Sequence, residues 1–129
     1  MNQKKIIEIL RTLAISSSGV NSSSHSSAIV RRGEIISFGV NQRKSHPFQK
    51  RFSRNENCIF FHAEVHSIFN ALKKISPDEL RKCELYVIRV LKNGKMTQSC
   101  PCIGCISAIN CFNIGNVFYS DSNGVIQCL

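Results

Sequence analysis

Apolar residues recur at helical spacing at the start of the chain, with charged residues between them. The apolar set consists of Ile6, Ile7, Leu10, Leu13 and Ala14. This period predicts an amphipathic helix over residues 3–14. The serine-rich residues 16–24 offer little to bury in a core, so we expect a loop there.

The pattern then changes to short runs rich in β-branched residues, which are typical of strands. The expected strands cover residues 27–30, 34–41, 85–91, 117–120 and 125–129. A turn at Arg32 and Gly33 makes the first two a hairpin, and a turn at residues 121–124 makes the last two an antiparallel pair. Asn93 and Gly94 form a turn just beyond the central strand.

Helical periodicity returns twice more along the chain. We expect a helix over residues 61–75, ended by Pro77, and another over residues 103–112, stopped by Gly115. Residues 42–57 are rich in basic side chains, and we expect a long loop there. The order of these elements predicts an α/β fold in which helices pack against one mixed sheet of five strands.

The length of 129 residues fits a single domain over residues 1–129, and 43% hydrophobic with 19% charged residues is the balance of a globular protein. The longest apolar runs are far shorter than the roughly 20 residues that a bilayer crossing needs, so we expect no membrane span. Glu8 and Arg11 interrupt the N-terminal apolar stretch, which argues against a secretory signal. We therefore expect a cytoplasmic protein.

Positive charge dominates the composition, with 17 Lys and Arg against 8 Asp and Glu and a formal net charge of +9. A positive surface attracts the phosphates of free nucleotides and of nucleic acids alike, and net charge also serves solubility. The charge alone does not separate these roles. The seven cysteines are an odd number, which favours reduced thiols and a metal site over a disulfide scaffold.

Two short motifs carry the candidate chemistry: H-A-E at residues 62–64 and P-C-I-G-C at residues 101–105. Taken alone, the Cys-x-x-Cys pair fits a redox pair, half of a zinc knuckle or coincidence. Two thiolates one helical turn apart, Cys102 and Cys105, can reach one tetrahedral zinc ion. His62 can supply a third ligand, which leaves the fourth position for water.

Glu64 follows His62 by two residues, at the start of the expected helix and beside that water. A carboxylate in this position can carry protons without being a ligand. Zinc lowers the pKa of its water toward roughly 7, so hydroxide is available as a nucleophile at neutral pH.

The combination of H-x-E with a later P-C-x-x-C is a signature of zinc-dependent base deaminases. From about residue 27 to residue 129 the chain resembles the cytidine deaminase-like superfamily. The resemblance implies a three-layer α-β-α fold with a mixed five-stranded sheet. It also implies the zinc ligands and the proton shuttle, which are His62, Cys102, Cys105 and Glu64. The reaction it implies is a hydrolytic deamination: hydroxide attacks a ring carbon, Glu64 passes the water's proton to the ring nitrogen and the departing amine, and ammonia is released.

The same resemblance implies two substrate contacts, one from Asn41 to the sugar and one from the backbone of Ala63 to the base. The histidine in the ligand set resembles deoxycytidylate, guanine, riboflavin-pathway and nucleic-acid deaminases. The closing hairpin instead resembles the branch that includes free cytidine deaminases and some bacterial DNA-acting toxins. We expect cytosine in a free nucleoside or nucleotide as the substrate, with deoxycytidylate as the first choice.

The basic segment after Asn41 is the expected binding site for the substrate phosphate. Its candidate residues are Arg43, Lys44, Arg51 and Arg54, with His46 as a further substrate contact. His66 lies one helical turn after His62, and we expect it to pack or to touch substrate. His25 is isolated in the sequence, and His46 is the stronger candidate of the two.

Two alternatives stay open. The first is the same chemistry on cytosine or adenine in single-stranded DNA or RNA, which the net charge favours and the absence of Trp disfavours. The second is a non-catalytic binding module stapled by zinc, against which Glu64 argues. Because the domain is small and its helices have apolar faces, we also expect a homo-oligomer, in line with the habit of the superfamily.

Overall fold

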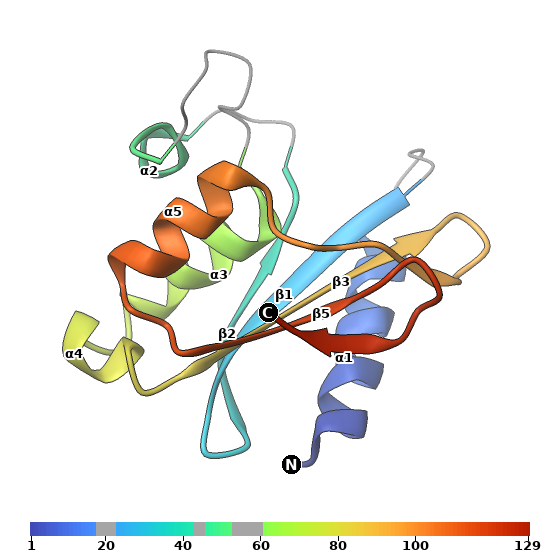
Figure 1. Cartoon of the computed structure of the whole chain (residues 1–129), viewed down its shortest axis with the longest axis horizontal. Helices are drawn as coiled ribbons and strands as arrows, with labels where there is room; N and C mark the ends of the chain where they lie inside the picture. The colour runs from blue at the N-terminus through green and yellow to red at the C-terminus, as the bar shows by residue number, and fades with distance from the viewer. Residues whose placement is uncertain (18–22, 43–45, 53–60) are drawn as a thin grey trace.

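The computed structural model describes residues 1–17, 23–42, 46–52 and 61–129 (Figure 1). Its strands form one mixed sheet in the order β2-β1-β3-β5-β6, with β4 paired to β3. The β3–β5 pair is parallel and the other pairs are antiparallel. The elements in chain order are α1 (Gln3–Ser16), β1 (Ser23–Arg31), β2 (Glu34–Val40), α2 (Pro47–Lys50), α3 (Ala63–Ala71), α4 (Pro77–Leu80), β3 (Glu84–Leu91), β4 (Met96–Thr97), α5 (Ile103–Cys111), β5 (Asn116–Ser120) and β6 (Ile126–Cys128).

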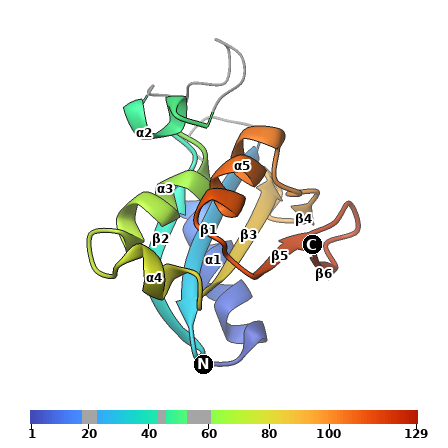
Figure 2. The same cartoon turned by 60° about the vertical axis from the view of Figure 1, so that its left-hand side comes forward.

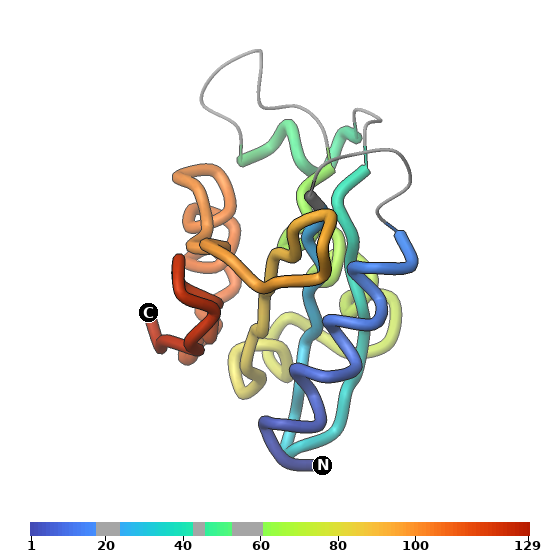
Figure 3. Tube along the Cα trace, turned by 90° about the vertical axis from the view of Figure 1, so that its right-hand side faces the viewer, coloured from blue at the N-terminus to red at the C-terminus, as the bar shows by residue number. Residues whose placement is uncertain are grey.

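The sheet separates two apolar layers, as the predicted three-layer α-β-α fold requires. Helix α1 covers one face, and α3 and α5 cover the other (Figure 2). Leu10 of α1 packs with Ile88 of β3, whereas Ile68 of α3 and Ile109 of α5 pack with Ile29 of β1. Figure 3 shows α1 in blue and α5 in orange with the strands between them. Successive residues of a strand alternate between these two layers.

The start of β1 corrects the loop expected over residues 16–24, because this strand begins at Ser23. Residues 18–22 lie outside the described residues. β1 pairs with β2 on one side and with β3 on the other. Two serines of this strand are buried with partners: Ser26 Oγ donates to Leu10 O of α1 at 2.6 Å, and Ser27 Oγ donates to Ala63 O of α3 at 2.5 Å. Hydrogen-bonded serines are tolerated in a buried strand. This serine-rich segment can therefore form an inner strand of the sheet, between β2 and β3.

Two helix ends also differ from the prediction. Helix α3 ends at Ala71 rather than at residue 75, and Pro77 opens α4 instead of ending α3. Proline fits the first turn of a helix because the missing N–H has no intrahelical partner there. Helix α5 ends before Asn113, which takes the left-handed conformation with φ 55° and makes Gly115 unnecessary as a stop.

The remaining strands confirm the sequence pattern. The hairpin turns at Arg32 and Gly33, both with positive φ, and the last two strands pair antiparallel across the predicted turn. Three elements were missed. Helix α2 lies within the expected basic loop, α4 follows the shortened α3, and β4 adds a sixth strand. Within the described residues, no helix has the length and apolar composition to cross a membrane.

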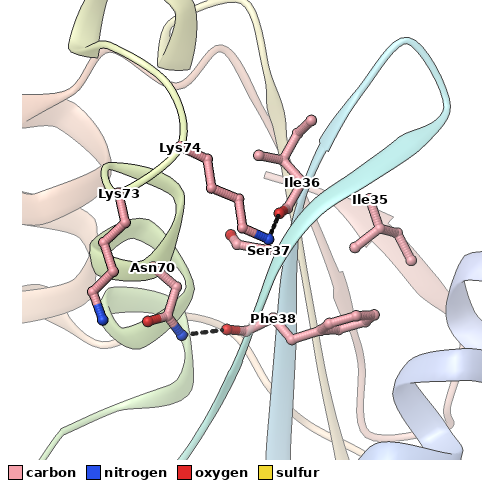
Figure 4. Close-up of a pocket in the computed structure, with 7 residues that line it drawn as sticks. All are labelled: Ile35, Ile36, Ser37, Phe38, Asn70, Lys73 and Lys74. Carbon is pink, nitrogen blue, oxygen red and sulfur yellow. Dashed lines mark hydrogen bonds between the residues drawn. The ribbon is translucent and has the colours of Figure 1, made fainter.

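The outer edge of β2 is covered by side chains that follow the H-A-E motif. Asn70 Nδ2 donates to Phe38 O at 2.9 Å, and Lys74 Nζ donates to Ile36 O at 3.0 Å (Figure 4). A pocket of about 370 Å³ lies along this edge. Its lining contains none of the predicted site residues. These contacts satisfy carbonyl groups that an edge strand otherwise leaves open to another strand.

Helix α3 lies directly against the backbone of β2 at Gly39. A Cβ atom at this position would overlap Ala63 O and Ser67 N of the helix backbone. The absent side chain therefore lets the helix that follows His62 sit directly on the sheet.

We expect Gly39→Ala to lower the free energy of unfolding by about 1–3 kcal/mol, because neither backbone partner can move aside without shifting α3. Gly115→Ala is the matched control, since nothing lies within 4 Å of its Cβ position. The control should stay within about 0.5 kcal/mol of the wild type. Urea unfolding of the three proteins measures both values, and equal stability of the two variants would contradict this account of the contact.

Candidate metal centre

The ligating atoms of His62, Cys102 and Cys105 lie within 4.8 Å of one another. His62 Nδ1 is 3.3 Å from Cys105 Sγ and 3.5 Å from Cys102 Sγ. In a tetrahedral zinc site with ordinary bond lengths, such ligand atoms lie roughly 3.5–3.8 Å apart. One nitrogen and two sulfur donors at this spacing fit a zinc ion. In the described part of the chain, the group comprises these three residues.

The ligands stand at the N-termini of two helices on the same face of the sheet. His62 is the N-cap of α3, and Cys102 is the N-cap of α5. Neither side chain makes a capping hydrogen bond, so both are available to a metal. The positive ends of the two helix dipoles favour thiolate charge at this point.

Buried serines hold the chain that leads to Cys102. Ser99 N donates to Ser120 O at 2.8 Å, and Ser99 Oγ lies 3.0 Å from Val87 O. Ser120 N donates back to Ser99 Oγ at 2.9 Å. The middle of β3 and the carboxyl end of β5 thereby hold the segment that leads to α5.

Protonation within the group follows its short contacts. Hydrogen bonds with Cys105 and with His62 lower the pKa of the Cys102 thiol to about 3. The contact with Cys102 raises the pKa of Cys105, and it also raises the pKa of His62. Negative charge is concentrated at Cys102 Sγ, which suits a site for a cation.

Glu64 lies in the first turn of α3 and is only 5% exposed. Burial raises the pKa of its carboxyl group. The carboxyl group interacts with the sulfur of Cys105 and the charge of His62. A buried carboxyl group beside the ligands, and outside the ligand group, is placed to exchange protons with a molecule held there.

Asn41 joins β2 to the start of α3. Ala63 N donates to Asn41 Oδ1 at 2.6 Å, which orients the amide. Its Nδ2 therefore faces His25 Nδ1, at 3.1 Å. The backbone N–H of Ala63 is thus already paired within the protein.

His25, isolated in the sequence, lies beside Asn41 in the fold. Its pKa is lowered to about 4, first by burial and then by the charges of Arg89 and His62. The neutral ring accepts the hydrogen bond from Asn41. Period-two counting back from Ile29 and Ser27 puts His25 on the α3 face of β1, so the signal was present once the strand is extended to Ser23.

The residues predicted to bind substrate phosphate are only partly described. Arg43, Lys44 and Arg54 lie outside the described residues. Arg51 is exposed, and its guanidinium group lies 5.4 Å from the centre of the Phe48 ring. A cation over an aromatic face is attracted to it, which helps to hold Arg51 against α2.

His46 has contacts within the protein that the sequence did not suggest. Its ring stacks on Phe61 with centroids 4.1 Å apart, and its Nδ1 accepts from Phe48 N at 3.1 Å as the N-cap of α2. His66 packs rather than joining the metal group: Val40 N donates to its Nδ1 at 3.1 Å, and its ring lies against Phe61.

The sequence from residue 1 to residue 121 matches the family described as the cytidine and deoxycytidylate deaminase zinc-binding region. No curated protein sequence matches the chain.

Solved structures share the fold at low sequence identity. A deoxycytidylate (dCMP) deaminase from the cyanophage S-TIM5 in apo form is 22% identical, with a TM-score of 0.57, 95% of this chain covered and 86% of that one. The same enzyme in complex with dCMP and dUMP gives 18% identity and a TM-score of 0.60, with 95% and 85% covered. A cytidine deaminase from Burkholderia pseudomallei gives 15% identity and a TM-score of 0.67, with 100% and 92% covered.

The geometry leads us to expect one zinc ion per chain, lost in Cys102→Ser because the thiolate with the lowered pKa is removed. Cys100→Ser is the matched control, since this exposed neighbour lies outside the ligand group. Elemental analysis after dialysis measures the zinc content, and thermal unfolding should show stability lost only in Cys102→Ser. Equal zinc content in the two variants would remove Cys102 from the ligand set.

Proposed function

This chain belongs to the family of cytidine and deoxycytidylate deaminases, and we propose that it hydrolytically deaminates cytosine in a free nucleoside or nucleotide. Deoxycytidylate is the favoured substrate. The observation that carries the proposal is the buried Glu64 carboxyl group beside a ligand group of His62, Cys102 and Cys105. Three protein ligands leave a coordination position open, as catalytic zinc sites do.

We assign the zinc ligands to His62 Nδ1 and to the Sγ atoms of Cys102 and Cys105, whose spacing fits the ion. When bound, zinc supplies Lewis-acid activation of water. The chain's own contribution is to hold two thiolates and one imidazole on rigid helix ends, so that little reorganisation is needed when the ion binds.

Glu64 is assigned the proton transfers. Its carboxylate takes a proton from the attacking water, and the acid so formed gives a proton to the ring nitrogen. A further transfer protonates the departing amine, so that water adds its oxygen to the ring carbon and ammonia leaves. Because the carboxyl group is buried, it does not exchange these protons freely with bulk water.

We assign substrate recognition to Asn41 and Ala63, as the resemblance implies. The Ala63 N–H is paired with Asn41 Oδ1. A base oxygen that binds this N–H must therefore displace Asn41, whose amide is then available to the sugar. His25, which accepts from the same amide, belongs to this recognition group.

A nucleotide is favoured over a nucleoside because of the basic segment between Asn41 and His62. Its members Arg43, Lys44, Arg51 and Arg54 are proposed phosphate contacts, and a bidentate arginine suits a phosphate group. The cyanophage enzyme of the same fold was solved with dCMP and dUMP, which supports a monophosphate for this chain as well.

We expect ammonia release and the absorbance change of cytosine loss with dCMP, and weaker turnover with deoxycytidine and cytidine. The assay compares these monomers with a cytosine-containing single-stranded oligonucleotide at two salt concentrations. Turnover confined to the oligonucleotide would replace this proposal by a nucleic-acid deaminase. Zinc binding with no turnover on the whole panel would favour a zinc-stapled binding module.

Glu64→Gln should lower turnover by roughly 100-fold or more, because the side chain keeps its size but loses the transferable proton. Zinc content and melting temperature should stay near those of the wild type, since no ligand is removed. Full activity of this variant, or loss of its zinc, would show that Glu64 does not have the assigned role.

A further inference from the structure

A glutamine is completely buried next to the candidate metal ligand. Gln49 of α2 has 0% exposure, and its Oε1 accepts a hydrogen bond from His62 N at 3.1 Å. An N-cap residue stands before the first helical turn, so its N–H has no partner inside the helix. Gln49 supplies that partner from a segment 13 residues earlier in the chain.

The helix that carries Gln49 is fixed in place although it is short. Phe48 and Phe52, exposed by 8% and 9%, anchor it in the core against α3 and α5. His46 caps its start and stacks on Phe61, with the two rings 10° from parallel. The segment from His46 to Gln49 thus contacts both residues that precede α3. His46 stacks on the ring of Phe61, and Gln49 accepts the hydrogen bond from His62 N.

We propose that Gln49 is a positioning residue for His62, which sets the imidazole for metal binding through the backbone. The side chain of His62 makes no capping bond to its own helix, so its direction depends on the backbone from which it projects. The backbone of His62 is extended, with φ −79° and ψ 151°. The hydrogen bond that His62 N donates to Gln49 Oε1 fixes the direction of its N–H group. This inference rests on the assignment of His62 as a zinc ligand in the proposed function.

A second buried bond to the same helix allows positioning to be separated from general stability. Ser37 Oγ donates to Ser67 O at 2.7 Å, in the middle of α3. Ser37 is 3% exposed. Loss of this bond should weaken the packing of α3 on β2 without turning His62.

The test compares Gln49→Met, which keeps the volume and removes the acceptor, with Ser37→Ala. Zinc affinity is measured by competition with a chromophoric chelator, using the full chain loaded with zinc. We expect a 10- to 100-fold weaker affinity in Gln49→Met, the range usual for partners that orient metal ligands. Ser37→Ala should stay within about 3-fold of the wild type. Amide hydrogen exchange at His62 should be faster in Gln49→Met only.

Two further variants keep the test decisive. Gln49→Glu retains an acceptor oxygen at the same reach and should restore the affinity. If Gln49→Met does not fold, Gln49→Asn, whose oxygen is one methylene too short, should weaken zinc binding in the same direction. Wild-type affinity in the variant without an effective acceptor, or an equal loss in Ser37→Ala, would overturn the proposal. A wild type that binds zinc but deaminates nothing would refute the proposed function alone and leave this inference standing.

Discussion

The first turn of α3 is held from outside the helix, and the arrangement of the candidate site depends on this. Side chains from β1, from the residue after β2 and from α2 bond to the backbone of Ala63 and His62, and the missing side chain of Gly39 lets the helix sit on the sheet. The bonds that Ala63 N and His62 N donate satisfy two N–H groups that a helix start leaves unpaired. The same contacts that stabilise the fold therefore aim the imidazole and bury the Glu64 carboxyl group.

Helix N-termini and hydrogen bonds set the charge of the thiol groups at this site. Two helix N-termini converge where the thiols lie, and hydrogen bonds lower the pKa of Cys102. Burial acts in the opposite way on Glu64, whose pKa it raises. The pKa values of two neighbouring acidic groups are thus shifted in opposite directions. Such separation of neighbouring pKa values is common where protons are transferred.

The segment between β2 and α3 has a structural part beside its basic residues. Its histidine, phenylalanines and glutamine pack against or bond to the start of α3, while Arg51 lies exposed over the Phe48 ring. The high density of positive charge predicts phosphate binding. It does not indicate which uncharged residues of the segment are buried in the core. The uncharged residues of the segment, Gln49 above all, connect it to the site.

The sequence alone predicted the strongly periodic elements and the candidate metal ligands. Helix α1 and strand β3 follow local apolar patterns, and the spacing of Cys102 and Cys105 reflects one helical turn, so both can be read without the fold. The buried serines of β1, the missed helix α2 and the roles of His25 and Gln49 were decided by tertiary structure. These residues are polar, and a polar group in the interior needs a hydrogen-bond partner. Ser27, His25 and Gln49 find such partners 36, 16 and 13 residues away in the chain, a distance that no local pattern records.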